Sequence, residues 1–356
     1  MSAVLAPPRP LERPFKLISQ SYPPSKTIGI MGISHYIKEI GRGKDGARSL
    51  SREQAADLFG QVLDGTVTDL EIGGFCLAMR IKGETAQEMA GFLDAAHDRL
   101  AKVPATDAPI IVLPSYNGAR KLPVLTPLLA LLLAREGLPV LVHGTPTESS
   151  RVFTSEVLQA LDIPAQTAIH AIGQGDVSFV PTEVLCPGLK RLLDVRRVVG
   201  LRNPAHSLVK VMNPCEGASL VVSSYTHPEY AVSMAATFEL MGTNAMLLRG
   251  TEGEVVADAR RMPQMEAFID GERQLLQEAQ PGSVGTLPLL PKTFDAPTTA
   301  AYIRAILAGE ESVPVPIARQ VKLIVGLADR IHPTSFQPSA RPAIDTQPPG
   351  QKAIQP

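Results

Sequence analysis

The N-terminal third of the chain carries apolar residues at the three- and four-residue intervals of amphipathic helices. Ser51 is followed three residues later by Gln54, a spacing that predicts a capping box at the start of a helix, and Gly65 is placed to end that helix. The expected helices span 33–40, 52–63, 69–80 and 86–100. This part of the chain is therefore predicted to be all-helical.

Beyond Pro104, short apolar runs alternate with helical segments. The runs have the length and character of buried strands, and they span 110–113, 139–144, 168–172, 219–223 and 245–250. Helical patterns between the runs cover 124–136, 154–161 and 228–241. This alternation is typical of a mostly parallel sheet covered by helices on both faces, so we expect an α/β fold here.

Proline-rich segments flank these two regions and are not expected to pack. A length of 356 residues suits two domains. The predicted parts are a basic Pro-rich arm over 1–26, a helical domain over 27–105, an α/β domain over 106–332 and a disordered Pro-rich tail over 333–356.

Composition narrows the class of protein. Hydrophobic residues make up 44% of the chain and charged residues 19%, which excludes global disorder. No apolar run reaches the roughly 18 residues that a membrane helix needs, and the N-terminus has no basic segment of a secretory signal. Cys76, Cys186 and Cys215 are far apart and lack metal-ligand spacing, so we expect three buried thiols in a cytoplasmic protein.

The net charge of −1 argues against a nucleic-acid partner until it is divided along the chain. Residues 1–52 hold nine Lys and Arg against three acidic residues, whereas residues 53–119 hold four basic against ten acidic residues. A polyanion responds to the local electrostatic field of the protein surface and not to the net charge of the whole chain. Charge alone therefore leaves nucleic acid among the possible partners.

Two segments carry a family resemblance. Residues 50–55 (LSREQA) and 72–85 (IGGFCLAMRIKGET) resemble the N-terminal helical domain of anthranilate phosphoribosyltransferase. The resemblance continues in register over about 50–322 and includes Gly200-Leu201-Arg202 and Asn213-Pro214. It implies a small all-helical N-terminal domain, which mediates dimerisation in relatives, on a large α/β domain with a mostly parallel central sheet. It also implies a ligand site in the cleft between them, to which the segment of about 176–202 returns.

The motifs that the transferase needs are absent from the matching positions. The family's glycine-rich diphosphate loop (GTGGDG) matches residues 113–118, LPSYNG, where Tyr116 is expected to fill the phosphate space. The family's NxST and KHGNR motifs match 123–126 (PVLT) and 142–146 (VHGTP), which lose most of the phosphate ligands.

The acidic pair that binds Mg²⁺ in the family falls at Val255-Val256, and isopropyl groups offer no oxygen ligand. Glu252, Glu254 and Asp258 lie nearby and leave open a displaced metal site. Because four separate features are missing, we expect no anthranilate phosphoribosyltransferase activity and assign no catalytic residue, metal or cofactor.

A more specific resemblance is to the YbiB-like branch of this family, carried by the segments 38–44, 114–121 and 249–254. That branch has the fold without the transferase motifs, and the resemblance implies nucleic-acid binding. We therefore expect a cytoplasmic homodimer, not an enzyme, that binds the backbone of DNA, in preference to RNA, through a basic groove and largely without sequence preference.

The candidate nucleic-acid contacts are the basic residues of the N-terminal region and of the loops near the cleft: Lys38, Arg42, Lys44, Arg48, Arg120, Lys121, Arg151, Lys190, Arg191, Arg196, Arg197, Arg202 and Arg249. A possible ligand cleft, in which an aromatic ring and backbone amides face a single strand, is formed by Tyr116, Asn117, Gly118, His143 and Gly144.

Other interpretations stay open at this point. Arg196 and Arg197 could pair with Asp194 and cap a helix, and Tyr116 and His143 could be packed core residues. The chain could also be a phosphoribosyl- or glycosyltransferase of altered substrate. A third interpretation is a sensor of a small carboxylate or phosphate that uses Arg196 and Arg202.

Overall fold

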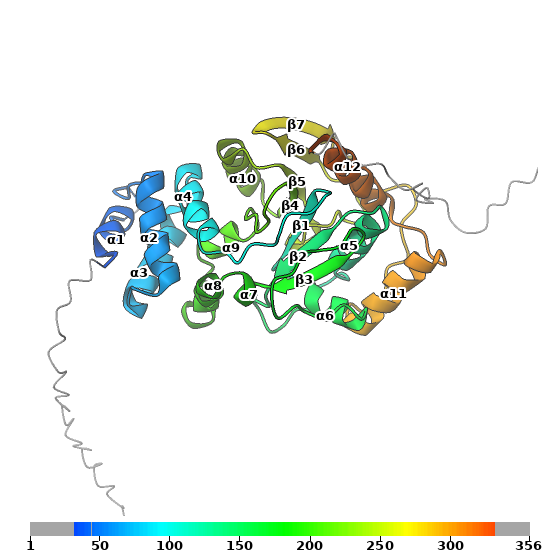
Figure 1. Ribbon diagram of the computed structural model, residues 1–356, viewed down its shortest axis with the longest axis horizontal. Coiled ribbons are helices and arrows are strands. Elements are labelled where there is room, and N and C mark those ends of the chain that lie inside the picture. The colour runs from blue at the N-terminus through cyan, green and yellow to red at the C-terminus, as the bar shows by residue number, and fades with distance from the viewer. Residues whose placement is uncertain (1–31, 44, 332–356) are drawn as a thin grey trace, which may run out of the picture. The chain divides into compact units, whose positions relative to one another are not determined.

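The computed structural model describes residues 32–43 and 45–331, which lie within one compact unit. The basic arm, Lys44 and the C-terminal tail lie outside the described residues. Helices α1 (Ser34–Ile40), α2 (Arg52–Asp64), α3 (Asp69–Lys82) and α4 (Ala86–His97) form a helical domain at one end (Figure 1).

Capping boxes start three of these helices. The predicted box of Ser51 and Gln54 is confirmed, and Thr68 and Thr85 open α3 and α4 in the same way. Each box satisfies backbone N–H groups that the first turn of a helix leaves without partners. The apolar faces then meet around Phe59 and Phe92, whose stacked ring centroids are 4.7 Å apart.

The α/β domain is built on one sheet of the described residues, with strand order β3-β2-β1-β4-β5-β6-β7. The strands are β1 (Ile110–Ser115), β2 (Val140–Gly144), β3 (Val177–Pro181), β4 (Ser219–Tyr225), β5 (Ala245–Arg249), β6 (Met265–Ile269) and β7 (Glu272–Gln277). The first five strands in this order run parallel, while β6 and β7 are antiparallel. The expectation of a mostly parallel α/β sheet after a helical domain is confirmed.

The strand expected over 168–172 is wrong. This segment is irregular, and the edge strand beside β2 is β3 at Val177–Pro181. Of the apolar residues that suggested a strand, Ile172 is buried in the core, Ile169 is partly buried, and Ala168 and Ala171 are exposed. The true edge strand has only mixed burial, so its apolar pattern is weak.

Further helices surround the sheet and connect its strands. They are α5 (Thr126–Arg135), α6 (Thr154–Ala160), α7 (Thr182–Leu185), α8 (Pro187–Val199), α9 (Ala205–Leu208), α10 (Pro228–Met241), α11 (Ala296–Ala308) and α12 (Val315–Ile331). One face of the sheet packs with α8, α9 and α10, and the other with α5, α6, α11 and α12 (Figure 1).

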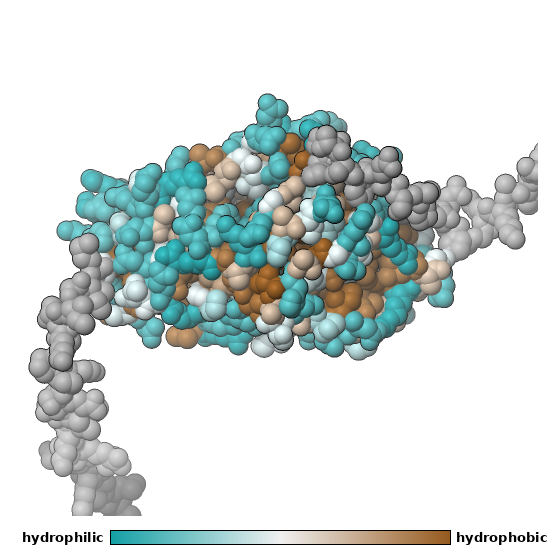
Figure 2. All heavy atoms as spheres, viewed as in Figure 1, coloured by the Kyte–Doolittle hydropathy of each residue, from teal (hydrophilic) through white to brown (hydrophobic). Residues whose placement is uncertain are grey.

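Helix α8 joins the helical domain to the α/β domain. It packs against α2, and a Cβ at Gly188 would lie 2.2 Å from the carbonyl oxygen of Leu63, so only glycine allows this approach. Helix α10 packs against α4 in a second junction. On the face seen in Figure 2, hydrophilic side chains predominate over the helical domain. Among the described helices, none is both long and apolar enough to cross a bilayer.

Candidate functional site

The loops that follow β1, β2 and β5 meet at the carboxyl edge of the sheet, where α/β proteins commonly bind ligands. The meeting point is occupied by the side chain of Glu254, which is only 2% exposed. The backbone N–H groups of Asn117 and Gly118 each donate to Oε1 of Glu254 at 2.8 Å. A carboxylate of the chain itself therefore occupies the anion position of the loop after β1.

Hydroxyl groups complete the shell around Glu254. The side chains of Ser115, Thr126 and Thr154 donate to its Oε2, at 3.0 Å from Thr126 and 3.4 Å from Thr154. Two N–H groups and several hydroxyls directed at one oxygen pair are the donors that a phosphate would need. The expected loss of phosphate binding thus has a structural cause beyond the missing glycines.

A second carboxylate of the same loop fills a neighbouring anion position. Glu252 accepts N–H bonds from Arg120, Lys121 and Leu122 at 2.9, 3.1 and 3.3 Å through its Oε2. Successive N–H groups of this kind form a concave anion site. The backbone at Glu252 and at Gly253 is left-handed, with φ of 53° and 88°, which turns both carboxylates toward the β1 loop.

The displaced metal site that Glu252, Glu254 and Asp258 left open is not formed. Glu252 and Glu254 accept protein donors, and Asp258 is paired with Arg260 at 2.8 Å. Across residues 32–43 and 45–331, no group of His, Cys, Asp and Glu side chains is arranged to hold a metal ion.

The ligand cleft expected at Tyr116, Asn117, Gly118, His143 and Gly144 is wrong, because all five residues are buried. The hydroxyl of Tyr116 lies 2.9 Å from Nδ1 of His143 and 3.0 Å from Oγ1 of Thr182. Burial raises the pKa of Tyr116 and lowers that of His143 to about 3, so the pair is neutral. Tyr116 is packed in the core and offers no face to a nucleobase.

Several of the predicted basic residues do come together, around Glu148 in the loop after β2. Arg151 binds its Oε2 at 2.8 Å, Arg196 binds its Oε1, and Arg202 lies 4.0 Å from the same oxygen. We call Glu148, Arg151, Arg196 and Arg202 the arginine cluster. Burial by itself would raise the pKa of Glu148, but hydrogen bonds from Arg196 and Arg151 outweigh it and lower that pKa.

The arginine cluster has an excess of positive charge and an unused donor. Three guanidinium groups share one carboxylate, and Nη1 of Arg196 is buried without a hydrogen-bond partner among the described residues. Burial, followed by the nearby charge of Arg196, lowers the pKa of Arg202. An uncompensated cluster of this kind is expected to attract anions.

Three exposed cations lie on the loops and helix that form the cluster. Arg197 is 63% exposed, pairs with Asp194 at 3.3 Å and reaches the carbonyl oxygen of Pro146 at 3.4 Å. Arg120 and Lys121 are exposed in the loop after β1, which is joined to the cluster by the bond from Arg151 to the carbonyl oxygen of Asn117. The pairing with Asp194 thus applies to Arg197, whereas Arg196 pairs with Glu148.

The remaining candidates lie apart from the cluster. Lys190 pairs with Asp194, and Arg191 donates to the carbonyl oxygen of Val62 and so ties α8 to α2. Arg249 is exposed at the end of β5. The candidates Lys38, Arg42 and Arg48 are exposed on the helical domain. No hydrogen bond or ion pair of the described residues links these six to the arginine cluster.

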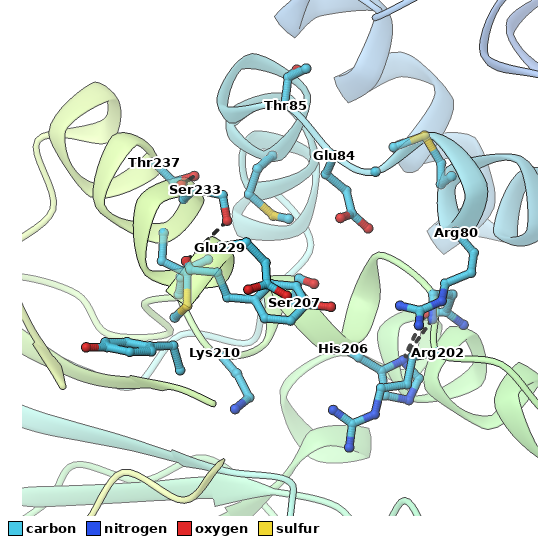
Figure 3. A pocket seen from close by; sticks show the side chains of 18 of the residues that line it. Arg80, Glu84, Thr85, Arg202, His206, Ser207, Lys210, Glu229, Ser233 and Thr237 are labelled. Atoms are coloured by element: carbon cyan, nitrogen blue, oxygen red, sulfur yellow. Dashed lines mark hydrogen bonds between the residues drawn. The ribbon is translucent and has the colours of Figure 1, made fainter. Parts of the chain in front are cut away.

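A cavity of about 420 Å³ lies between the two domains (Figure 3). It is lined by the end of α3 and its connection to α4, by α9, by the end of β4 and by α10. Lys210 is one of the lining residues and donates to the carbonyl oxygen of Gly253 at 2.9 Å, and burial lowers its pKa to about 8. Lys210 and Glu148 belong to no sequence motif, and the partners that give them their place, Gly253 for Lys210 and Arg196 for Glu148, lie 43 and 48 residues away in the chain.

Comparisons with known proteins agree with the fold. Residues 34–99 match a family of domains described as the helical bundle domain of a glycosyl transferase family. An uncharacterised protein of Escherichia coli strain K12, YbiB, is 42% identical over 295 residues, which cover 80% of this chain and 91% of YbiB. An anthranilate phosphoribosyltransferase of Methanosarcina acetivorans is 30% identical over 273 residues, which cover 74% of this chain and 68% of that protein.

Solved structures show the same architecture. The anthranilate phosphoribosyltransferase of Thermus thermophilus superimposes with a TM-score of 0.60 at 21% identity, covering 84% of this chain and 89% of that chain. The enzyme of Saccharomyces cerevisiae in complex with PRPP and Mg gives a TM-score of 0.61 at 12% identity, with the same two coverages, 84% and 89%.

Proposed function

The chain belongs to the anthranilate phosphoribosyltransferase-like family, and from this premise we propose that it is a nucleic-acid-binding protein without transferase activity. The observation that carries the proposal is the arginine cluster. A small phosphate is bound by N–H groups that converge on one point, and here Glu254 and Glu252 occupy those groups. A long polyanion instead needs cations spread along a surface.

The cluster and its surroundings supply such a surface. Arg151, Arg196 and Arg202 share Glu148, and the exposed side chains of Arg120, Lys121 and Arg197 flank them. In this proposal these six residues contact phosphates, and DNA is the expected ligand. We expect little sequence preference, because contacts to the phosphate backbone carry no base information.

The test is a titration of duplex DNA by fluorescence anisotropy at increasing salt. We expect the logarithm of the association constant to fall with the logarithm of the salt concentration, by about 0.9 for each phosphate neutralised. The same titration with RNA of equal length measures the preference between the two nucleic acids. Absence of binding to both at low salt would overturn the proposed function.

We also propose that the protein is a homodimer through its helical domain. Leu70, Leu77 and Ile81 are exposed by 87%, 46% and 67%, and their spacing places them on one face of α3. Gly73 lies between them with no heavy atom within 4 Å of an added Cβ, which leaves room for a neighbouring helix. Such an exposed apolar face is typical of a protein interface.

Substitution Leu77→Glu is expected to convert the dimer to a monomer, because it places a charge in the apolar contact. Light scattering after size-exclusion chromatography measures the mass of each species. Leu289→Glu, at a residue that is 82% exposed outside α3, is the matched control and should stay dimeric. A monomeric wild-type protein, or a dimeric Leu77→Glu variant, would contradict this interface.

We further propose that the protein works in the cytoplasm. Its cysteines, Cys76, Cys186 and Cys215, are all buried free thiols, which suits a reducing compartment.

A further inference from the structure

Glu148 joins two parts of the chain at the arginine cluster. It lies in the loop between β2 and α6, and both of its carboxylate oxygens accept hydrogen bonds from arginines. Arg151, from the same loop, donates to Oε2 at 2.8 Å, and Arg196, from the last turn of α8, donates to Oε1. The side chain of Glu148 is 23% exposed, so these contacts lie at the protein surface and not in the core.

The carboxylate leaves much of the cluster without a partner. One negative charge faces three guanidinium groups, and Nη1 of Arg196 is buried without a hydrogen-bond partner among the described residues. Arg202 lies 4.0 Å from Oε1 of Glu148, which is too long for a hydrogen bond. The neighbouring carboxylate of α8, Asp194, pairs with Arg197 and so does not compensate the excess. The cluster therefore keeps positive charge for further anionic groups.

The bonds to Glu148 occupy donors that a phosphate of bound DNA would use. Nε of Arg151 binds Glu148 and its Nη1 binds the carbonyl oxygen of Asn117, so most of this guanidinium group is engaged inside the protein. Although burial opposes it, the hydrogen bonds from the arginines keep the pKa of Glu148 below its usual range, and the side chain is negatively charged at neutral pH. A phosphate that approaches Arg151 or Arg196 meets this charge, and like charges repel.

A nucleic acid is nevertheless able to displace the carboxylate. Each partly exposed ion pair contributes little to stability, because water and salt screen it. A single carboxylate neutralises only one of the three guanidinium groups, whereas the phosphates of a strand supply one negative charge each. Exchange of Glu148 for phosphates therefore costs little for each pair and compensates the cluster more completely.

We propose that Glu148 is an internal competitor of nucleic acid, an inference that rests on the proposed function. Its carboxylate holds the arginine cluster when no ligand is bound, and the phosphates of the DNA backbone displace it. Because these ion pairs must be broken first, DNA binds less tightly than the cations of the cluster would allow. Loss of a cation and loss of the charge of Glu148 thus have opposite effects: the first weakens DNA binding and the second strengthens it.

The test is Glu148→Gln in the full-length protein, measured by fluorescence anisotropy with duplex DNA. The amide has the shape of the carboxylate and its oxygen still accepts a hydrogen bond, but the negative charge is removed. We expect about tenfold tighter binding at about 0.1 M salt, and a salt dependence that is steeper by about 1, because a displaced carboxylate takes up a counterion that the amide does not need.

Glu216→Gln is the matched control. Glu216 is exposed and lies outside the arginine cluster, and its substitution changes the net charge of the chain by the same amount. This variant should bind DNA like the wild type, within about twofold, because the local field at the cluster is unchanged.

A pair of further variants keeps the test valid if three arginines without a carboxylate destabilise Glu148→Gln. Arg151→Gln alone should weaken DNA binding by about tenfold, because it removes a phosphate contact and leaves the charge of Glu148 in place. The double variant Arg151→Gln with Glu148→Gln has the net charge of the wild type. It should bind DNA about tenfold more tightly than Arg151→Gln alone, and circular dichroism checks that each variant is folded.

The two proposals fail in different ways. If the wild type binds DNA but Glu148→Gln binds no more tightly than Glu216→Gln, Glu148 is not a competitor, while the proposed function stands. Weaker binding by Glu148→Gln would also overturn the inference, since Glu148 would then serve only to position the arginines. Absence of DNA binding by the wild type at low salt would overturn the proposed function and this inference together.

Discussion

Glu254→Ala is expected to destabilise the protein by about 3 kcal/mol or more and to create a binding site for small anions. The side chain is buried and accepts N–H bonds from Asn117 and Gly118 and hydroxyl bonds from Ser115 and Thr126. Its removal leaves these donors buried without an acceptor. The bonds removed are charge-assisted, and each contributes more than a bond between neutral groups.

Urea unfolding measures the loss of stability, and added formate or phosphate measures the new site. An anion that binds only the folded variant stabilises it by mass action, so either ion should restore part of the lost free energy of unfolding. The wild-type protein should be stabilised less than the variant by either ion, because Glu254 already fills the position. Glu216→Ala, at an exposed glutamate, is the matched control.

The result shows whether Glu254 takes the place of a bound phosphate. If Glu254→Ala is as stable as Glu216→Ala, and neither anion stabilises it, the carboxylate does not substitute for phosphate. In that case the missing glycines and cations of the loops would be the whole cause. Rescue by phosphate would instead indicate that the anion-binding donors persist beneath an internal carboxylate.

Reversing the charge of Arg120, Lys121 and Arg197 to glutamate is expected to weaken DNA binding by a hundredfold to a thousandfold. Each cation that binds a phosphate is worth roughly tenfold in affinity at about 0.1 M salt, and the salt dependence should become shallower by about 1 for each phosphate that is no longer neutralised. These three side chains are exposed, so the fold should tolerate the changes. Anisotropy titrations at several salt concentrations measure both quantities.

The matched control reverses three exposed cations elsewhere, Arg261, Lys292 and Lys322, none of which belongs to the arginine cluster. The two triple variants have the same net charge. A difference in their affinity for DNA therefore reports the local electrostatic field around the substituted residues. If both variants lose affinity equally, DNA senses the net charge and the arginine cluster is not the site. Circular dichroism confirms that each variant is folded.

Local patterns in the sequence predicted much of the fold. The capping box of Ser51 and Gln54 and the helix Pro228–Met241 lie where the pattern placed them. These features depend on residues three or four positions apart, so a short window contains all that determines them. The antiparallel β6–β7 hairpin was not predicted, although the Asp270-Gly271 pair is a sequence signal for a hairpin turn. In the structure both residues have positive φ, as a tight hairpin turn requires.

The edge strand shows where local pattern is insufficient. The run 168–172 is as apolar as a strand, but β3 at Val177–Pro181 pairs with β2 instead. The choice depends on which segment can align its backbone with Val140–Gly144. Periodicity in one segment carries no information about that pairing.

The absence of the transferase motifs, the two-domain α/β fold and the family could all be obtained from the order of residues, because each depends on a short pattern or on similarity along the chain. The roles of Glu254 and Glu148 could not be obtained from the order of residues. The main-chain donors to Glu254, at Asn117 and Gly118, lie 137 and 136 residues earlier in the chain, and Arg196 lies 48 residues from Glu148. Only folding of the β1, β2 and β5 loops onto one edge brings these groups within hydrogen-bond distance, and that distance makes a candidate metal ligand the acceptor for the N–H groups of the β1 loop.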